Sequence, residues 1–214
     1  MAISDTRSTD PDVRELARLA HDAAAGGLLA GKAGRTHFHV GDRPDRLAIL
    51  RKLLDEHDVK PEWLYPTHVE RTEPLMREAV ELAKRGCSVD VDVVEGDLAK
   101  WLKVYRDAGG PPERLTASSD ASITPPKSLF EQVRSCVTEH GFDLADVLRH
   151  VTSNTADVLK LPGKGRLADG KDADVLVLER GSLELVEVIA GGRRLLRDGR
   201  AAVEEPGERE LAHV

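Results

Sequence analysis

Strand-like and helix-like segments alternate through the middle of this 214-residue sequence, and this order restricts the possible folds more than any other feature. Four short apolar segments begin near residues 35, 63, 87 and 115, and each is followed by a segment whose apolar residues have helical spacing. Each unit takes about 25 to 30 residues, as a strand, a helix and their connections do. The order predicts an α/β fold with a parallel sheet covered by helices. A closed eight-stranded barrel needs about 250 residues, so these units correspond to half of one.

The two ends of the chain differ from this middle part. Near the N-terminus, Asp10 and Pro11 predict the start of a helix, and Gly26-Gly27 predicts its end. After residue 160, the segments "ADVLVLE" and "LELVEVIAGG" are strand-like, with no helical segment between them. We therefore expect an α/β domain over 1–160, a small β appendage over 161–203 and a loose tail over 204–214.

Charge and composition argue against several classes of partner. The formal net charge is −7 and the sequence has no long basic run, which argues against nucleic acid or an anionic membrane surface as a partner. No stretch approaches the roughly 20 apolar residues of a membrane span, and the first residues lack the apolar core of a secretory signal. The two cysteines do not form a disulfide scaffold. We expect a cytoplasmic protein.

Three residues with suitable chemistry follow predicted strands. They are His39 in "HFHVGD", His68 in "YPTHVER" and Asp120 in "TASSDAS". The carboxyl ends of parallel strands meet at one face of the fold, where α/β barrels carry their active sites. Neutral imidazoles suit zinc or a similar divalent ion, and a carboxylate can bind a metal while it also handles a proton. The sequence therefore predicts a metal site built from these three residues.

Several motifs give the sequence a specific resemblance that covers almost the whole chain. These motifs are "AISDTR", "GGLLAGKAG", "HFHVGD", "LYPTHVER", "LTASSD" and "TSNTADVLKLPGKGRLADGKDADVLVL". Together they resemble the amidohydrolase superfamily and, within it, the isoaspartyl dipeptidase (β-aspartyl peptidase) branch. The resemblance implies that residues 1–160 form the C-terminal half of a TIM-like (β/α)8 barrel, containing strands five to eight. It also implies that residues 161–203 contribute strands of a small β-sandwich.

The resemblance implies a role for each of the three polar residues. His39 and His68 match the metal-binding histidines of the fifth and sixth barrel strands. Asp120 matches the eighth-strand aspartate, which binds the other metal ion and acts as general base and acid. The complete enzyme would hold two divalent ions, with zinc expected. His37 stands where the family has an apolar residue, so we expect it behind the metal ligands or in the barrel interior.

Three further residues are implied as substrate contacts. Arg7 and Arg71 match positions that hold the α-carboxylate end of the substrate, and a guanidinium binds a carboxylate through two parallel hydrogen bonds. Thr124 stands where the family has a substrate-binding serine. The resemblance thus implies metal-dependent hydrolysis of β-aspartyl dipeptides, with a small dipeptide as substrate and a homo-oligomer as the complete enzyme.

The sequence also departs from the family pattern. The family needs an HxH pair from the first strand and a carboxylated lysine from the fourth strand, and neither is assigned in this sequence. We therefore expect a C-terminal fragment of a longer metallo-dipeptidase, inactive in isolation. Two alternatives stay open: another amidohydrolase, such as a cyclic amidase or a deaminase, and a non-catalytic half-barrel that serves as an assembly module.

Overall fold

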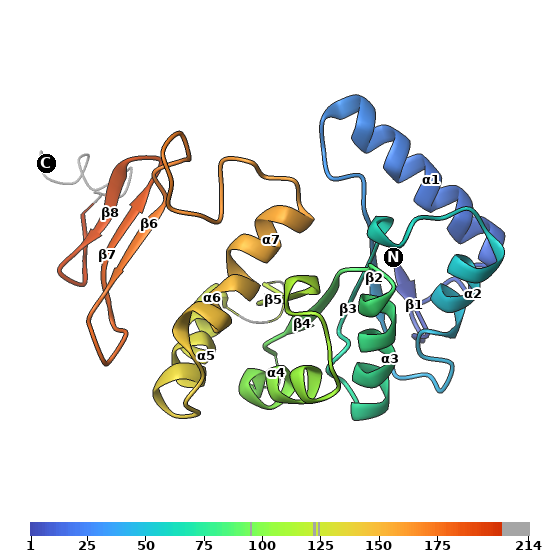
Figure 1. The fold of residues 1–214 in the computed structure, drawn as a ribbon, viewed down its shortest axis with the longest axis horizontal. Coiled ribbons are helices and arrows are strands. Elements are labelled where there is room, and N and C mark those ends of the chain that lie inside the picture. The colour runs from blue at the N-terminus through green and yellow to red at the C-terminus, as the bar shows by residue number, and fades with distance from the viewer. Residues whose placement is uncertain (95, 122, 124, 203–214) are drawn as a thin grey trace, which may run out of the picture. The chain divides into compact units, whose positions relative to one another are not determined.

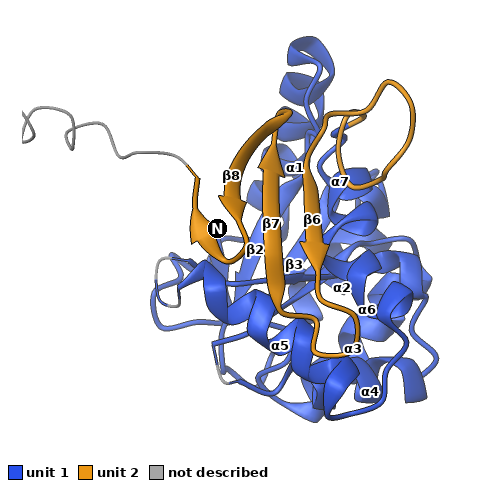
Figure 2. Ribbon diagram, turned by 90° about the vertical axis from the view of Figure 1, so that its left-hand side faces the viewer, with its two compact units in different colours: residues 1–161 blue, residues 162–214 orange. Residues whose placement is uncertain are grey.

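The computed structural model describes residues 1–94, 96–121, 123 and 125–202 of the chain. The chain divides into two compact units, Met1–Leu161 and Pro162–Val214, which Figure 2 shows in different colours. The first unit contains parallel strands and the second contains antiparallel strands. The predicted tail over 204–214 and the predicted substrate contact Thr124 lie outside the described residues.

In the first unit, strands and helices alternate as the sequence predicts, so the α/β class is confirmed (Figure 1). The strands are β1 (Ala2–Ile3), β2 (Thr36–Val40), β3 (Leu64–Thr67), β4 (Val89–Asp92) and β5 (Leu115–Ser118). The helices are α1 (Val13–Ala30), α2 (Ala48–Glu56), α3 (Glu73–Lys84), α4 (Leu98–Asp107), α5 (Pro126–Thr138), α6 (Leu144–Val151) and α7 (Ser153–Val158). Short 3₁₀ turns, Pro61–Trp63 and Pro112–Arg114, lead into β3 and β5.

The strands of this unit pair in parallel, which brings their carboxyl ends together. The orders are β1-β2-β3 in one sheet and β4-β5 in another. His39 is in register with Ala2 on one side and with Thr67 on the other, and Asp92 is in register with Ser118. Residues at or just after these strand ends therefore lie at the same end of the unit.

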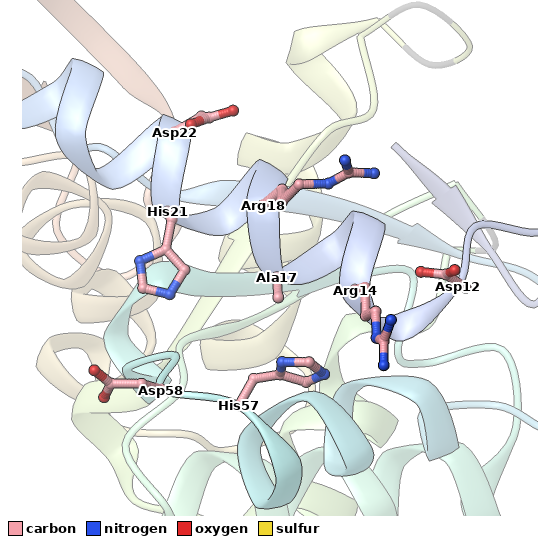
Figure 3. A pocket seen from close by; sticks show the side chains of 8 residues that line it. All are labelled: Asp12, Arg14, Ala17, Arg18, His21, Asp22, His57 and Asp58. Atoms are coloured by element: carbon pink, nitrogen blue, oxygen red, sulfur yellow. The ribbon is translucent and has the colours of Figure 1, made fainter.

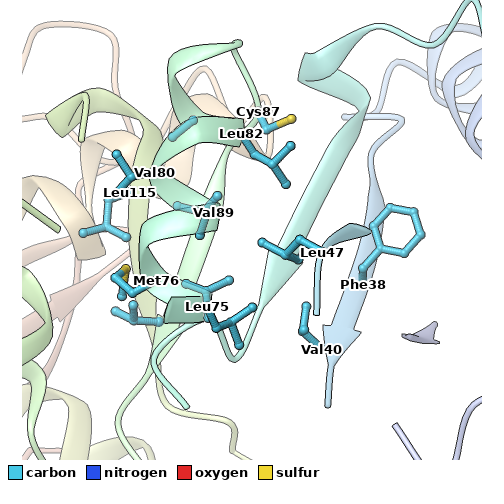
Figure 4. Close-up of a cluster of buried hydrophobic side chains, with 14 of the residues drawn as sticks. Phe38, Val40, Leu47, Leu75, Met76, Val80, Leu82, Cys87, Val89 and Leu115 are labelled. Atoms are coloured by element: carbon cyan, nitrogen blue, oxygen red, sulfur yellow. The ribbon is translucent and has the colours of Figure 1, made fainter. Parts of the chain in front are cut away.

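Alternation along β2 separates a core face from a polar face. Phe38 and Val40 are fully buried in the hydrophobic core, together with apolar side chains of α1, α2 and α3. Figure 4 shows part of this core, where Leu75 and Met76 of α3 lie near strand residues. His37 and His39 point to the opposite face, because side chains alternate along a strand. The core thus holds β2 in place while the other face carries the histidines.

Helix α1 differs from its prediction at both ends. It begins at Val13, and Asp12 rather than Asp10 is the N-cap: its carboxylate accepts from the Glu15 backbone N–H, and the Glu15 side chain bonds back. This reciprocal capping box satisfies two free N–H groups of the first turn. The helix also continues past Gly26-Gly27 to Ala30 and ends at Gly31, which has the left-handed φ of 64° typical of a helix end.

The second unit contains a four-stranded antiparallel sheet. Its strands are β6 (Val175–Leu178), β7 (Leu185–Ala190), β8 (Arg193–Arg197) and β9 (Arg200–Ala201), in the order β6-β7-β8-β9. No helix occurs in the described part of this unit, 162–202, as the absence of helical spacing predicts. Among the described residues of the whole chain, no helix is long and apolar enough to cross a membrane.

Candidate functional site

Two predicted metal ligands meet at the carboxyl ends of β2 and β3. His39 is the fourth residue of β2, and His68 follows β3 directly. Nδ1 of His39 lies 3.0 Å from Nε2 of His68, and the ring centroids are 5.0 Å apart. His39 is half-buried and His68 is buried. The structure therefore brings together two imidazole nitrogens that come from neighbouring strands.

The donor set fits a divalent ion. A zinc ion about 2.0–2.1 Å from two imidazole nitrogens in tetrahedral geometry places those nitrogens about 3.3–3.4 Å apart. The observed separation of 3.0 Å is slightly shorter. Small rotations of the two rings would open the gap to that distance. His39 and His68 thus suit the role of two ligands to the same ion.

Asp120 acts electrostatically on His39. It follows β5 (Leu115–Ser118) by two residues. Burial lowers the pKa of His39, the neighbouring His68 lowers it further, and the negative charge of Asp120 acts in the opposite direction. The pKa of Arg7 is raised, mainly by its contacts with Asp5 and to a smaller extent by the charge of Asp120. Asp120 is therefore within electrostatic reach of both a predicted metal ligand and a predicted substrate contact.

Two of these residues have a backbone conformation that is uncommon outside glycine. The φ angles are 62° at His68 and 45° at Asp120. Such conformations cost on the order of 1–3 kcal/mol each and cluster at functional sites, where the surrounding structure holds them. His68 follows β3 directly and Asp120 follows β5 by two residues, so the left-handed turn helps set the direction of each side chain at the strand end.

His37 has a different environment from His39. Its ring stacks on Tyr65, with centroids 4.7 Å apart and an angle of 17° between the planes. Its centroid lies 5.0 Å from that of His39. The two histidines thus share one face of β2, but His37 lies two residues before His39 in the strand and packs on an aromatic ring.

A buried acidic pair behind His68 was not identified from the sequence. Asp92, the last residue of β4, accepts a hydrogen bond of 2.5 Å from His68 Nδ1, and its backbone N–H donates to Glu70 Oε2 at 3.3 Å. Burial and the neighbouring Asp92 raise the pKa of Glu70 well above its usual range. Burial also opposes ionisation of Asp92, but its hydrogen bonds with His68, Glu70 and Val94 hold its pKa well below the usual range. Together His68, Glu70 and Asp92 place potential ligand atoms within 4.8 Å of one another.

A second buried carboxylate, Asp90, lies on β4 two residues before Asp92. Asp90 accepts hydrogen bonds from four hydroxyl groups, at distances of 2.5–3.3 Å. They belong to Tyr65 and Thr67 of β3 and to Thr116 and Ser118 of β5. Burial raises the pKa of Asp90, and these hydrogen bonds oppose that effect. Asp90 therefore links the three strands that lead to His68, Asp92 and Asp120.

The predicted substrate-binding arginines lie on the same side of the unit and each has an acidic partner. Arg7 binds Asp5 through Nε and Nη2, at 2.9 and 2.7 Å. Arg71 Nη1 lies 2.9 Å from Asp42 Oδ1. The hydrogen bonds from Arg7 hold the pKa of the buried Asp5 well below its usual range, and the charge of Arg71 contributes to this effect. The two guanidinium groups thus lie within electrostatic reach of a common carboxylate.

A surface groove of about 730 Å³ lies away from these residues, between α1 and the end of α2 (Figure 3). Its lining includes Arg14, Arg18 and His21 of α1, with His57 and Asp58 after α2. None of these side chains belongs to the strand-end cluster. The groove mixes basic and acidic groups, and none of its charged side chains is fully buried.

The fold is an α/β fold with imidazole and carboxylate groups gathered at strand ends, and the sequence assigns it to a family: residues 14–195 match the amidohydrolase family, so the chain belongs to that family. The resemblance inferred from the motifs is thereby confirmed. Among solved structures, the chain is similar to the β-aspartyl dipeptidase of the thermophilic, keratin-degrading Fervidobacterium islandicum, with 32% identity and a TM-score of 0.89. The match covers 96% of this chain and 57% of that enzyme.

Two other structures give the range of the similarity. The same Fervidobacterium islandicum dipeptidase in complex with a β-Asp-Leu dipeptide matches with 30% identity and a TM-score of 0.89, over 96% of this chain and 58% of that one. A zinc-complexed atrazine chlorohydrolase of Arthrobacter aurescens matches with 16% identity and a TM-score of 0.61, over 92% and 51%. The second likeness concerns the fold alone. The chain thus spans little more than half the length of these relatives.

Proposed function

We propose that the chain contributes to metal-dependent hydrolysis of β-aspartyl (isoaspartyl) dipeptides. In this proposal, the first unit is the C-terminal half of an amidohydrolase barrel, with β2 to β5 as barrel strands five to eight, and the second unit is part of a small β-sandwich. The observation that carries the proposal is the pair of imidazole nitrogens 3.0 Å apart at neighbouring strand ends, with Asp120 in electrostatic reach. The dipeptide bound to the similar Fervidobacterium islandicum enzyme supports the choice of substrate.

His39 and His68 would hold a divalent ion, with zinc proposed. Both present a ring nitrogen to the same point, and neutral imidazole is the preferred nitrogen ligand of zinc. When bound, such an ion lowers the pKa of a bound water and polarises the scissile carbonyl. The proposed active enzyme holds two ions. The similar dipeptidase is matched over only 57% of its length, and the remaining metal ligands would come from the part of such an enzyme that this chain does not cover.

Asp120 would accept the proton of the attacking water and deliver it to the leaving amine. Its carboxylate lies at the carboxyl end of β5, in electrostatic reach of His39. A carboxylate serves as a general base when it is held within hydrogen-bond distance of the proton it removes. The left-handed backbone at Asp120 fixes the direction of this group at the strand end.

Arg7 and Arg71 would hold the α-carboxylate end of the dipeptide. The Asp5 carboxylate occupies Nε and Nη2 of Arg7, which fixes the plane of the guanidinium. Asp42 is largely exposed, so its ion pair with Arg71 is weak and easily replaced by a substrate carboxylate. A planar guanidinium recognises a carboxylate by two parallel hydrogen bonds, which gives orientation as well as affinity.

The test is a fusion that places, in front of Met1, the part of the Fervidobacterium islandicum dipeptidase that this chain does not cover. With zinc supplied, we expect this fusion to hydrolyse β-Asp-Leu and the 214-residue chain alone to be inactive. Asp120→Asn should abolish hydrolysis, because an amide does not accept the proton of the water.

The arginines provide the specificity test. Arg71→Met in the fusion should weaken kcat/KM for β-Asp-Leu by roughly 2–5 kcal/mol, as for removal of one partner of a buried charge pair. The matched control is Arg77→Met, an exposed arginine of α3 that pairs with Glu73, and it should leave kcat/KM unchanged. A fusion that folds and binds zinc but hydrolyses a cyclic amide and no β-aspartyl dipeptide would contradict the proposal.

A further inference from the structure

The two ring nitrogens of His68 have different partners. Nδ1 lies 2.5 Å from Asp92 Oδ2, and Nε2 lies 3.0 Å from His39 Nδ1. The side chains of His68 and Asp92 are 8% and 5% exposed, so bulk water does not compete for their contact. One nitrogen therefore faces a carboxylate behind the site, and the other faces the proposed metal position.

The chemistry of these partners determines where the proton of His68 resides. A neutral imidazole has one N–H donor and one bare nitrogen, and an ionised carboxylate only accepts hydrogen bonds. The contact with Asp92 therefore requires the proton on Nδ1. Nε2 is then the bare nitrogen, with its lone pair directed toward the side of His39.

Asp92 is itself held on both oxygens and on its backbone. Oδ1 accepts from the Val94 backbone N–H at 2.9 Å, and Oδ2 accepts from His68. The Asp92 backbone N–H donates to Glu70 Oε2 at 3.3 Å. The carboxylate is thus fixed at the end of β4 before any ligand arrives, and its orientation is imposed by β4 and the turn after it.

The same contacts argue against a cation held directly by His68, Glu70 and Asp92. The atom of His68 that faces Asp92 is Nδ1, and as a ligand to an ion beside Asp92 it would have to give up the proton of the Asp92 hydrogen bond. Such an ion would also have to replace the 2.5 Å contact and the bond from Val94. The Nε2 side of His68 needs no such rearrangement, because it already points to a second nitrogen ligand.

We propose that Asp92 is a positioning residue that holds His68 in the Nδ1–H tautomer, so that Nε2 is presented to the metal together with His39 Nδ1. The proposal rests on the proposed function only in taking His68 as a metal ligand. In proteins, a carboxylate behind a metal-binding histidine fixes its tautomer and orientation, and its loss costs 10–100-fold in metal affinity.

The first measurement is the tautomer of His68 in the zinc-free chain at neutral pH, read from the imidazole 15N shifts and assigned with His68→Ala. We expect a protonated Nδ1 and a bare Nε2 in the wild type. In Asp92→Asn, one end of the amide is a donor, so the contact with either Val94 N–H or His68 Nδ1–H is lost and the single tautomer should give way to a mixture. A wild-type His68 with its proton on Nε2 would overturn the proposal.

The second measurement is zinc affinity by competition with a chromophoric chelator. Asp92→Asn and Asp92→Ala should bind zinc 10–100-fold more weakly than the wild type. Glu70→Gln is the matched control: it keeps an oxygen for the Asp92 N–H, so it should stay within about threefold of the wild type. Equal losses in Glu70→Gln and Asp92→Asn would instead mean direct ligation, and an unchanged affinity in both Asp92 variants would also overturn the proposal.

These measurements separate the two proposals. The tautomer needs neither metal nor hydrolysis, so an inactive fusion leaves the role of Asp92 standing. Conversely, a fusion that hydrolyses β-Asp-Leu with an unchanged His68 tautomer in Asp92→Ala would retain the dipeptidase proposal and reject the positioning role. Circular dichroism of each variant checks that the fold is preserved, and the wild-type tautomer alone decides the proposal if a variant does not fold.

Discussion

Two adjacent glycines of α1 should respond in opposite ways to the same substitution. Gly26 is exposed, and a Cβ added there would meet no atom within 4 Å. Gly27 is buried, and a Cβ there would lie 2.2 Å from Gly34 Cα and 2.5 Å from Gly34 N. Both glycines lie inside the helix, so they differ in packing and not in secondary structure.

The magnitudes follow from these surroundings. Gly26→Ala should raise the free energy of unfolding by about 0.5–1 kcal/mol, because alanine loses less conformational entropy in a helix. Gly27→Ala has the same benefit, but the new methyl group collides with backbone, which cannot rotate away as a side chain does. Overpacking of this kind costs typically about 1–3 kcal/mol, and a 2.2 Å contact belongs at the upper end. The two variants should therefore differ by roughly 2–3 kcal/mol.

The assay is urea-induced unfolding of both variants and the wild type, followed by circular dichroism at one protein concentration. The expected order of stability is Gly26→Ala, then wild type, then Gly27→Ala. In thermal unfolding, each kcal/mol should shift Tm by about 2–4 °C for a chain of this size. A Gly27→Ala variant as stable as Gly26→Ala would refute the close approach of α1 to Gly34.

Three further predictions concern the strand ends and the core. Gly41→Ala should destabilise the chain by about 1–3 kcal/mol in urea unfolding, because its Cβ would lie 2.3 Å from Ser4 O and 2.5 Å from the Asp5 Cα. Burial lowers the pKa of His150, whose Nδ1 lies 3.0 Å from Leu115 O. Its unfolded form therefore binds protons more readily, so its contribution to stability is complete above about pH 6.5 and is lost as the pH falls. The stability difference between wild type and His150→Gln should accordingly shrink between pH 7 and pH 5, and a constant difference would contradict this. Metal analysis of the dialysed 214-residue chain should find at most one weakly held zinc ion, because two histidines are an incomplete ligand set; two tightly held ions per chain would contradict the ligand assignment.

The sequence was sufficient to predict which strand ends carry the histidine pair. Strand–helix alternation predicts parallel strands, and parallel strands bring residues that follow them to the same face. His39 and His68 satisfy this rule, and their nitrogens lie 3.0 Å apart. The prediction needed only the order of the elements and the place of each histidine relative to its strand, which are both local properties of the sequence.

Contacts between elements were not predictable in the same way. Gly26-Gly27 has the local appearance of a helix end, but Gly27 lies against Gly34, a contact that exists only after the chain has turned back. Similarly, "VDVDV" predicts a strand with both aspartates on one face, but it does not say which strands lie on either side of it. The role of Asp92 depends on its contact with His68 from β3, so local patterns could indicate the side of the strand and not the partner.

Two aspartates of β4 support the histidine pair in different ways: Asp92 contacts His68, and Asp90 contacts the strand that leads to it. Asp90 takes hydroxyl donors from β3 and β5, and it is fully buried, so each lost donor would leave part of its charge without compensation. Asp92 lies two residues further along β4 and contacts His68, where the chain leaves β3 in a strained conformation. The strain at His68 can persist only if the surrounding structure fixes the strand before it, and Asp90 does so through Thr67. The geometry of the histidine pair therefore depends on a carboxylate that contacts neither histidine.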